Sequence, residues 1–343
     1  MANFTASNLV KAQALLNQNF QSSELRVQRS PILGLGLQNA NILIPAHNEL
    51  RTREDRPIDA HIIKRNLRTT TGMTRTHDHT GVLGDSMAVP VTFVQFVDKF
   101  QMTLKWLDNN LYNFDEILAN QFFQAFQNIN IGIEAHLTDF MATKKTQVNV
   151  ATKNGTFDAT KHVFEIKSSA TDKVGLVFED AKSMMRQNHY QGVYDVVCDP
   201  KLYRDAAFYA AQGGANATNL GFQFGGMNIV ESITVNDSAY TGGIAFFLPV
   251  NTFAVLDWIP VQNRRGVGDY NSYVGGFGAM RDPISGLTFA VHAYQQRANT
   301  ASRNGNSQDV VMEFEVSVDI SANVAPLSTA TETVVFQVAQ VAA

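Results

Sequence analysis

The sequence predicts an α+β fold, in which helices and strands come from separate stretches of the chain. Three observations carry this prediction. Residues 114–146 hold one apolar stripe at the period of an α-helix. Residues 312–320 alternate between apolar side chains and acidic or hydroxyl ones, as a strand with one buried face does. Residues 88–104 are rich in β-branched and aromatic side chains, which favour extended backbone.

The composition favours assembly over dispersion as a monomer. Only 17% of the 343 residues are charged, below the roughly 25% typical of globular proteins, and amides are frequent. The net charge of −4 argues against a basic DNA-reading domain, because phosphate contacts need clustered lysine and arginine. The single cysteine, Cys198, excludes an intramolecular disulfide and is predicted to be a buried strand residue. We find neither a secretory signal nor the about 20 consecutive apolar residues of a membrane span.

The N-terminal 44 residues are predicted to form an arm. A short helix around Leu9 and Leu16 is followed by a segment in which Pro31, Gly34 and Gly36 are expected to prevent regular structure. Because such a segment buries little within itself, we expect it to lie on another surface.

Residues 57–104 are predicted to be two extended limbs joined by a polar, glycine-punctuated turn. Both faces of the returning limb are largely apolar, so it calls for cover on two sides. A two-stranded projection is marginally stable alone in water, and we therefore expect it to rest on something else.

The strongest helical signal lies in residues 114–146, which we call the spine helix. Its stripe is Leu118, Phe122, Phe126, Ile129, Ile133, Leu137 and Phe140. Asn113 and Glu116 fit a capping box at its start, and a helix of this extent would be about 50 Å long. Glu134 and Asp139 are assigned to its solvated surface.

The remaining chain mixes helices, strands and turns. Asn154-Gly155 indicates a hairpin turn, and residues 172–192 a helix that ends at Gly192. A strand containing Cys198 and a further helix follow, and residues 262–282 are expected to form a long glycine-rich loop.

Two chemical hypotheses were weighed for residues 74–86, TRTHDHTGVLGDS. His77 and His79 supply at most a pair of metal ligands on a turn, whereas metal sites typically need three or four ligands. Ser86 follows a Gly-Asp pair, as in some hydrolases, but a nucleophile elbow needs a helix after the serine, and here a strand is predicted. Neither hypothesis has its required context, and no catalytic, cofactor or metal residue is predicted.

The order of these parts resembles the major capsid protein of tailed bacteriophages, the Hong Kong 97-like fold shared with encapsulins. The stretches that carry the resemblance are 57–104, 114–146 and the passage from Tyr194 to Ser232, with its G-F-Q-F-G-G-M-N-I sequence. The resemblance implies five regions: an N-terminal arm at 1–44, an extended loop at 45–104, a peripheral domain at 105–190, an axial domain at 191–298, and C-terminal strands returning to the peripheral domain at 299–343.

The resemblance further implies pentamers and hexamers of this chain in an icosahedral virion shell, assembled in the host cytoplasm around double-stranded DNA that is not bound sequence-specifically. Scaffold, portal and decoration proteins would be its other partners, with no membrane and no cofactor. The side chains expected to contact a neighbouring subunit are Arg51, Arg53, Arg56, Lys64, Arg65, Arg68, Arg75, His77, His79, Phe93 and Phe96. Those expected in a loop near the ring axis are Arg264, Arg265, Tyr270, Tyr273 and Phe277.

Three alternatives stay open at this point. The same fold would serve an encapsulin-type cellular compartment. Another virion part, such as a tail tube or sheath, and a hydrolase using Ser86 or the His77/His79 pair are the others.

Overall fold

A computed structural model of the chain describes residues 4–19, 30–63, 86–103, 113–145, 151–168, 175–212, 221–224, 226–297, 310–325 and 334–342. The helices are α1 (Ala6–Asn19), α2 (Pro31–Leu43), α3 (His47–Thr52), α5 (Phe114–Thr143), α6 (Gly175–Gln187), α7 (Pro200–Gln212) and α8 (Val261–Arg265). A two-stranded ribbon pairs β1 (Asp59–Ile63) with β2 (Ser86–Pro90).

The other strands form two larger sheets. The six-stranded sheet contains β3 (Val94–Thr103), β10 (Phe253–Trp258), β11 (Gly268–Asp269), β12 (Gly275–Arg281), β13 (Thr288–Arg297) and β14 (Val310–Val324). The seven-stranded sheet runs in the order β4-β5-β15-β9-β6-β8-β7. Its strands are β4 (Gly155–Asp158), β5 (Val163–Ser168), β6 (Tyr194–Cys198), β7 (Gly221–Phe224), β8 (Met227–Glu231), β9 (Ile244–Pro249) and β15 (Phe336–Ala342).

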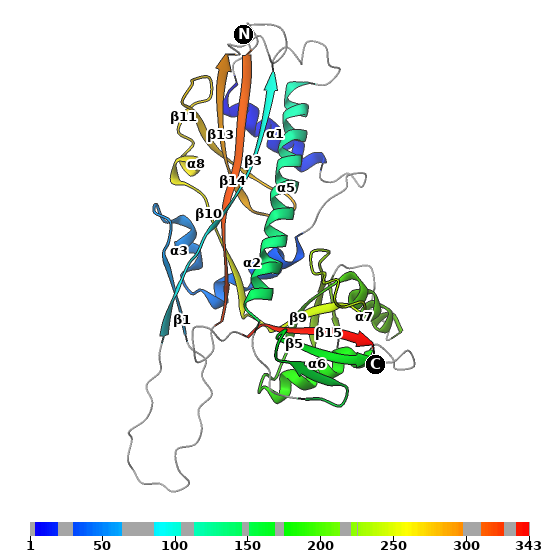
Figure 1. Cartoon of the computed structure of the whole chain (residues 1–343). Helices are drawn as coiled ribbons and strands as arrows, with labels where there is room; N and C mark the ends of the chain where they lie inside the picture. Colours follow the sequence, from blue (N-terminus) through cyan, green and yellow to red (C-terminus); the bar gives the residue numbers. More distant parts are fainter. Residues whose placement is uncertain are drawn as a thin grey trace, which may run out of the picture.

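The six-stranded sheet is antiparallel and built around β14. One side of β14 pairs with β3 along ten residues, and the other side pairs with β13 and then β10. The predicted alternation in β14 is confirmed, since Phe314, Val316 and Val318 are buried while Glu313 and Glu315 are partly exposed. This apolar face lies under α5, which runs along β3 and β14 (Figure 1).

The predicted spine helix is confirmed as α5, which spans 30 residues. Both halves of the capping box form: the Asn113 side chain accepts from the backbone at Glu116, and the Glu116 side chain accepts from the backbone N–H of Asn113. Its apolar stripe packs on aromatic residues of the sheet, with Phe122 5.7 Å from Phe314 and Phe126 stacked 4.8 Å from Phe289, between ring centroids.

The predicted irregularity around Pro31, Gly34 and Gly36 is wrong, because these residues lie in α2. Pro31 occupies the first turn, where its missing N–H costs nothing. Gly36 has a packing role, since a Cβ there would lie 2.4 Å from Cγ2 of Val255 on β10. The glycine lets the helix lie directly on the sheet.

The expectation that the N-terminal segment lies on another surface is confirmed for residues 4–19 and 30–44, and that surface belongs to the same chain. Leu9 and Leu16 of α1 are buried in the main core. Phe4 makes edge contacts with Phe114, Tyr270 and Phe314. These residues are an integral part of the core.

The seven-stranded sheet is covered on both faces. On one face α6 and α7 pack in a core of their own, which includes the predicted buried strand residue Cys198; burial raises the pKa of its thiol well above the usual value. Val197 and Phe246, on the other face, belong to the main core around α5. The two sheets therefore meet through shared apolar contacts near the C-terminal end of α5 (Figure 1).

Three local predictions need correction. Asn154-Gly155 lies at the start of β4, and the β4–β5 turn is made by residues 159–162. Helix α6 ends at Gln187 rather than at Gly192. Residues 262–282 contain most of α8 together with β11 and β12, so they are not one long loop.

The strands of the two sheets are interleaved along the chain. Residues 155–187 lie with the seven-stranded sheet, although the predicted peripheral range runs to 190. Residues 253–297 lie with α5 and the six-stranded sheet, and β15 joins the seven-stranded sheet. The division into domains by the predicted ranges stays a prediction.

The two glycines of α2 provide a matched test of this packing. We expect Gly36→Ala to lower the free energy of unfolding by about 1–3 kcal/mol, because its methyl group would overlap Val255. Gly34→Ala should raise it by up to about 1 kcal/mol, since nothing lies within 4 Å of the added Cβ and alanine favours a helix. Urea unfolding measures both, and equal shifts would contradict the assigned packing.

Candidate assembly interface

The predicted pair of limbs is confirmed where the structure describes it. β1 and β2 pair antiparallel from Asp59 opposite Pro90 to Ile63 opposite Ser86, and the ribbon points away from both sheets (Figure 1). The returning limb does not continue as one strand, because the chain leaves the ribbon after Pro90 and enters the six-stranded sheet as β3. The segment 64–85 lies outside the described residues.

The root of the ribbon is held by Arg56, which precedes β1. Its guanidinium forms an ion pair with the carboxylate of Asp319 on β14, and the Asp319 side chain is only 4% exposed. The guanidinium also lies over the rings of Phe93 and Trp258, 5.7 and 5.6 Å from their centroids. Phe93 follows β2, so one cation joins both limbs to two strands of the sheet.

The protonation of Asp319 depends on this contact. Burial raises the pKa of its carboxyl above the ordinary value, and the Arg56 charge and hydrogen bond oppose that rise. Without Arg56 the carboxylate would be left nearly buried and unpaired, which is costly.

Helix α3 fixes the segment that leads into the ribbon. His47 is buried, with Nε2 3.1 Å from the carbonyl oxygen of Val255, and burial lowers the pKa of its imidazole. Arg51 donates to Asp257 at 2.6 Å, and Trp258 Nε1 donates to the carbonyl of Arg53 at 3.2 Å. The chain is thus tied to β10 at several points before it reaches Arg56.

The predicted contact residues divide into three groups. Arg51 and Arg56 have carboxylate partners in their own chain, and Arg53 has an exposed side chain. Phe93 packs at the root of the ribbon, whereas Phe96 turns toward α5, 5.7 Å from the ring of His136. Outside the described residues lie Lys64, Arg65, Arg68, Arg75, His77 and His79. Their contact with a neighbouring subunit stays a prediction.

The predicted axial-loop residues lie beside the six-stranded sheet. Arg264 donates to backbone carbonyls of the segment leading to the ribbon, and Arg265 pairs with Glu54. Tyr270 is buried and donates its hydroxyl to the carbonyl of Phe277 at 3.1 Å. Phe277 packs on His292, while Tyr273 is 74% exposed. A position near a ring axis stays a prediction.

Several large apolar side chains of these elements face solvent. Ile58, directly before β1, is 77% exposed, and Val97 on β3 is 42% exposed. The returning limb calls for cover on two sides, and the face of β3 that carries Val97 is open within this chain. Such side chains favour an intermolecular contact.

The structure tests one of the two chemical hypotheses, since His77 and His79 lie outside the described residues. Ser86 begins the strand Ser86–Pro90, so the helix that a nucleophile elbow needs after its serine is replaced by a strand, as the sequence predicted. Within the described part of the chain, no three His, Cys, Asp or Glu residues are grouped as metal ligands.

Among the described helices, none is both long and apolar enough to cross a bilayer.

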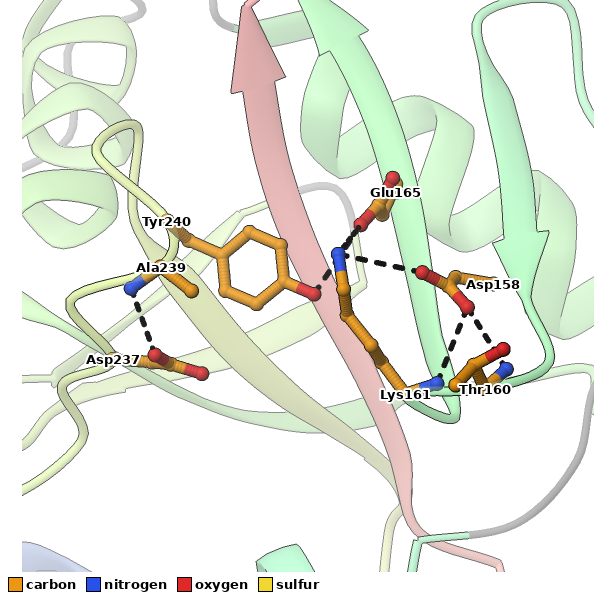
Figure 2. Close-up of polar contacts among 7 residues, drawn as sticks. All are labelled: Asp158, Thr160, Lys161, Glu165, Asp237, Ala239 and Tyr240. Carbon is orange, nitrogen blue, oxygen red and sulfur yellow. Dashed lines mark hydrogen bonds and ion pairs between the residues drawn. The ribbon is translucent and has the colours of Figure 1, made fainter.

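A second polar cluster lies at the edge of the seven-stranded sheet (Figure 2). Lys161, in the β4–β5 turn, lies 3.0 Å from Glu165 and 3.4 Å from Asp158, and its amine is 5.4 Å from the ring of Tyr240. The hydrogen bonds to Glu165 and Asp158 raise the pKa of Lys161. The Tyr240 hydroxyl donates to the same Glu165 oxygen at 3.3 Å. The cluster fastens this turn to the loop before β9.

Three residues of the ribbon root were missed by sequence reasoning: Asp257, Trp258 and Asp319. An aspartate inside the apolar run FAVLDW was a usable signal for a buried ion pair, because an unpaired carboxylate is not tolerated there. Asp319 carried no such signal, since it fits the solvent-facing positions of an alternating strand.

Comparison with known proteins shows the fold. No family model matches the chain, and no curated protein does. A solved structure titled Mycobacterium phage Che8 matches with a TM-score of 0.50 and 11% identity, covering 92% of this chain and 94% of that chain. A capsid structure of cyanophage P-SCSP1u matches with a TM-score of 0.49 and 14% identity over 100% of both chains. A capsid of Ralstonia phage GP4 matches with 0.48 and 12% identity, over 94% of each chain. The α+β fold expected from the resemblance is confirmed, and at these identities the likeness concerns the fold alone.

The root of the ribbon can be tested by removing its cation. We expect Arg56→Ala to lower the free energy of unfolding by about 1–2 kcal/mol at neutral pH, since the arginine is partly exposed while Asp319 is not. The deficit should shrink toward acid pH, where Asp319 becomes neutral. Urea unfolding at several pH values measures it.

Two controls accompany this test. Arg53→Ala removes an exposed arginine three residues away and should change the stability by less than about 0.5 kcal/mol. Adding Asp319→Asn to Arg56→Ala should recover part of the loss. A loss that is independent of pH and unaffected by Asp319→Asn would contradict the ion pair.

Proposed function

We propose that this chain is a major capsid protein that assembles with copies of itself into a closed icosahedral shell. One observation carries the proposal: a ribbon that points away from both sheets and is fixed at its base by Arg56. The fold shared with the phage Che8 chain supports it. The proposal assigns the chain a structural role and no catalytic step.

The ribbon supplies the physical reason for assembly. A two-stranded ribbon is marginally stable by itself in water, and this one begins next to the exposed Ile58. If it lies on a neighbouring copy whose own ribbon lies on a third, the contact is heterologous. Contacts of this kind form rings when the rotation between copies closes. Pentamers and hexamers are the rings that an icosahedral shell requires.

The sequence of the ribbon tip suits a polar contact. Residues 64–75 hold Lys64, Arg65, Arg68 and Arg75 and no acidic residue. We propose that these cations, with His77 and His79, meet acidic or backbone acceptors on the neighbour. Exposed pairs of this type determine register more than stability.

The other partners follow from the shell. The interior would enclose double-stranded DNA without sequence-specific contacts, in keeping with the net charge of −4. Scaffold, portal and decoration proteins would act during and after assembly in the host cytoplasm. The final location would be the virion capsid.

The register of the ribbon offers a direct test. Because Ile63 lies opposite Ser86, residues 64–85 can be replaced by Asn-Gly, which closes a two-residue hairpin turn without changing the pairing. We expect this variant to fold with a midpoint of thermal unfolding within a few degrees of the parent and to form no closed shells. Electron microscopy of both proteins under the same conditions measures the outcome.

The same experiment includes a control variant and distinguishes the alternative functions. Replacing Ser86 by alanine should leave shells intact. Loss of a hydrolytic activity in that variant, or in one that replaces His77 and His79, would favour the hydrolase. Tubes in place of shells would favour a tail protein. An enzyme cargo inside particles from the natural source, in place of DNA, would favour an encapsulin. Closed shells formed by the Asn-Gly variant would overturn the role given to the ribbon.

A further inference from the structure

A buried polar stripe runs along α5 beside its apolar one. Asn130, Glu134 and Thr138 follow each other at one-turn intervals, and Asn130 and Glu134 are each 0% exposed. The assignment of Glu134 to the solvated surface is therefore wrong, whereas Asp139 is exposed as expected. A carboxyl fully inside a core needs a specific reason to be there.

The three side chains of this stripe reach three different parts of the chain. Asn130 donates to Asp282 in the turn after β12 at 2.8 Å. Glu134 accepts from the Ser232 hydroxyl at 2.7 Å and from the backbone N–H of Ile32 at 3.3 Å. Thr138 lies 2.7 Å from the Thr234 hydroxyl. Glu134 is the member that touches both the start of α2 and the segment after β8.

Glu134 acts as the cap of α2. The residue before that helix, Ser30, makes no side-chain capping bond and donates its hydroxyl to the carbonyl of Asn130. The free N–H groups of the first turn therefore need another acceptor, and Glu134 provides it from α5. The same Oε1 atom binds Ser232, whose neighbour Thr234 completes a chain of hydroxyls.

Only one oxygen of this carboxyl is satisfied. Oε2 of Glu134 is buried and has no hydrogen-bond partner among the described residues. Ionisation would leave charge on an oxygen without a donor inside the core, which costs more than a neutral acid there. Burial raises the pKa of Glu134 to about 7. The hydrogen bonds from the Ser232 hydroxyl and from the first backbone N–H groups of α2 lower that pKa, but by less.

The surrounding charges do not supply a counter-ion. Most titratable groups on the elements around Glu134 have partners of their own. Asp282 binds Asn130, Asp98 of β3 binds Asn128, and Asp195 of β6 binds Asn39 of α2. Lys11 of α1 pairs with Asp115, and Glu315 and Asp319 of β14 pair with Lys99 and Arg56. On α5 itself, His136 packs against Phe96 of β3 and Asp139 is exposed, while Glu231 precedes Ser232. α2 itself contains no titratable side chain.

We propose that the Glu134 carboxyl is a protonation-dependent joint that ties α5 to the start of α2 and to residues 232–234, closed when neutral and loosened when ionised. The joint connects α5 to the residue that follows β8 of the seven-stranded sheet. Opening would admit water to Oε2 and release Ser232 and the first N–H groups of α2. This inference does not rest on shell assembly and can be tested on the unassembled chain.

The direction of the pH effect follows from the two pKa values. In the closed joint the pKa is about 7, and in an open, solvated one it returns toward 4.5. Between these values the closed form holds a proton that the open form lacks, so the joint weakens as the pH rises from 4.5 to 7 and changes little above 7. Each pH unit inside that window lowers the closed-to-open ratio by up to about tenfold.

Hydrogen exchange of backbone amides tests the joint in the full chain. We expect the protection factors of the Ile32 and Leu33 amides to fall by roughly 100-fold between pH 5 and pH 8, after correction for intrinsic exchange, with little further change to pH 9. In Glu134→Gln, whose side chain keeps its shape and cannot ionise, these factors should be independent of pH. Asp139→Asn, which removes an exposed carboxyl from the same helix, should behave as the parent does.

A second variant guards against a Glu134→Gln protein that does not fold. Ser232→Ala removes a donor that favours the ionised carboxylate, so the midpoint of the pH effect should move upward. Protection at Ile32 and Leu33 that is constant from pH 5 to pH 8 in the parent would overturn the proposal. So would a pH dependence that survives in Glu134→Gln, or a midpoint that Ser232→Ala leaves unchanged.

Discussion

The structure depends on the burial of one face of α5. A helix of 30 residues with a continuous apolar stripe is not stable in water by itself, and here β3 and β14 cover the stripe from one side while α1 and α2 close it from others. The aromatic contacts of Phe122 and Phe126 with Phe314 and Phe289 place the helix axis along the strands. Because β14 pairs with β3, β13 and β10, fixing α5 on this sheet also fixes the strands from which the ribbon leaves.

The elements that could be predicted are those whose signal is local. The stripe of α5 and the alternation of β14 each arise from residues close in sequence. The failures share the opposite cause. Gly34 and Gly36 are poor helix formers, and α2 exists because Gly36 lets the helix approach Val255, more than 200 residues later. The glycines of β12 likewise lie in a strand because β13 pairs with it.

The candidate site was predictable only in part, for the same reason. The basic residues around the ribbon were identified from their type. The carboxylate partner of Arg56, however, is Asp319, which lies 263 positions away on a strand whose alternation predicts that it faces water. Glu134 was misplaced because its donors, Ile32 and Ser232, are each about 100 residues distant. Polar groups that are buried and paired over long separations follow a fold that is already formed, so their burial cannot be inferred from their neighbours in sequence.

The two polar sites place different demands on the same core. At the root of the ribbon, an ion pair and two aromatic rings hold the outgoing limb in one direction, which lowers the entropy lost when that limb meets a partner. At the joint, one carboxyl with a single satisfied oxygen connects α5 to the segment after β8 of the seven-stranded sheet. The ion pair with its aromatic rings thus lies where the ribbon leaves the six-stranded sheet, and the half-satisfied carboxyl lies where α5 meets the segment after β8.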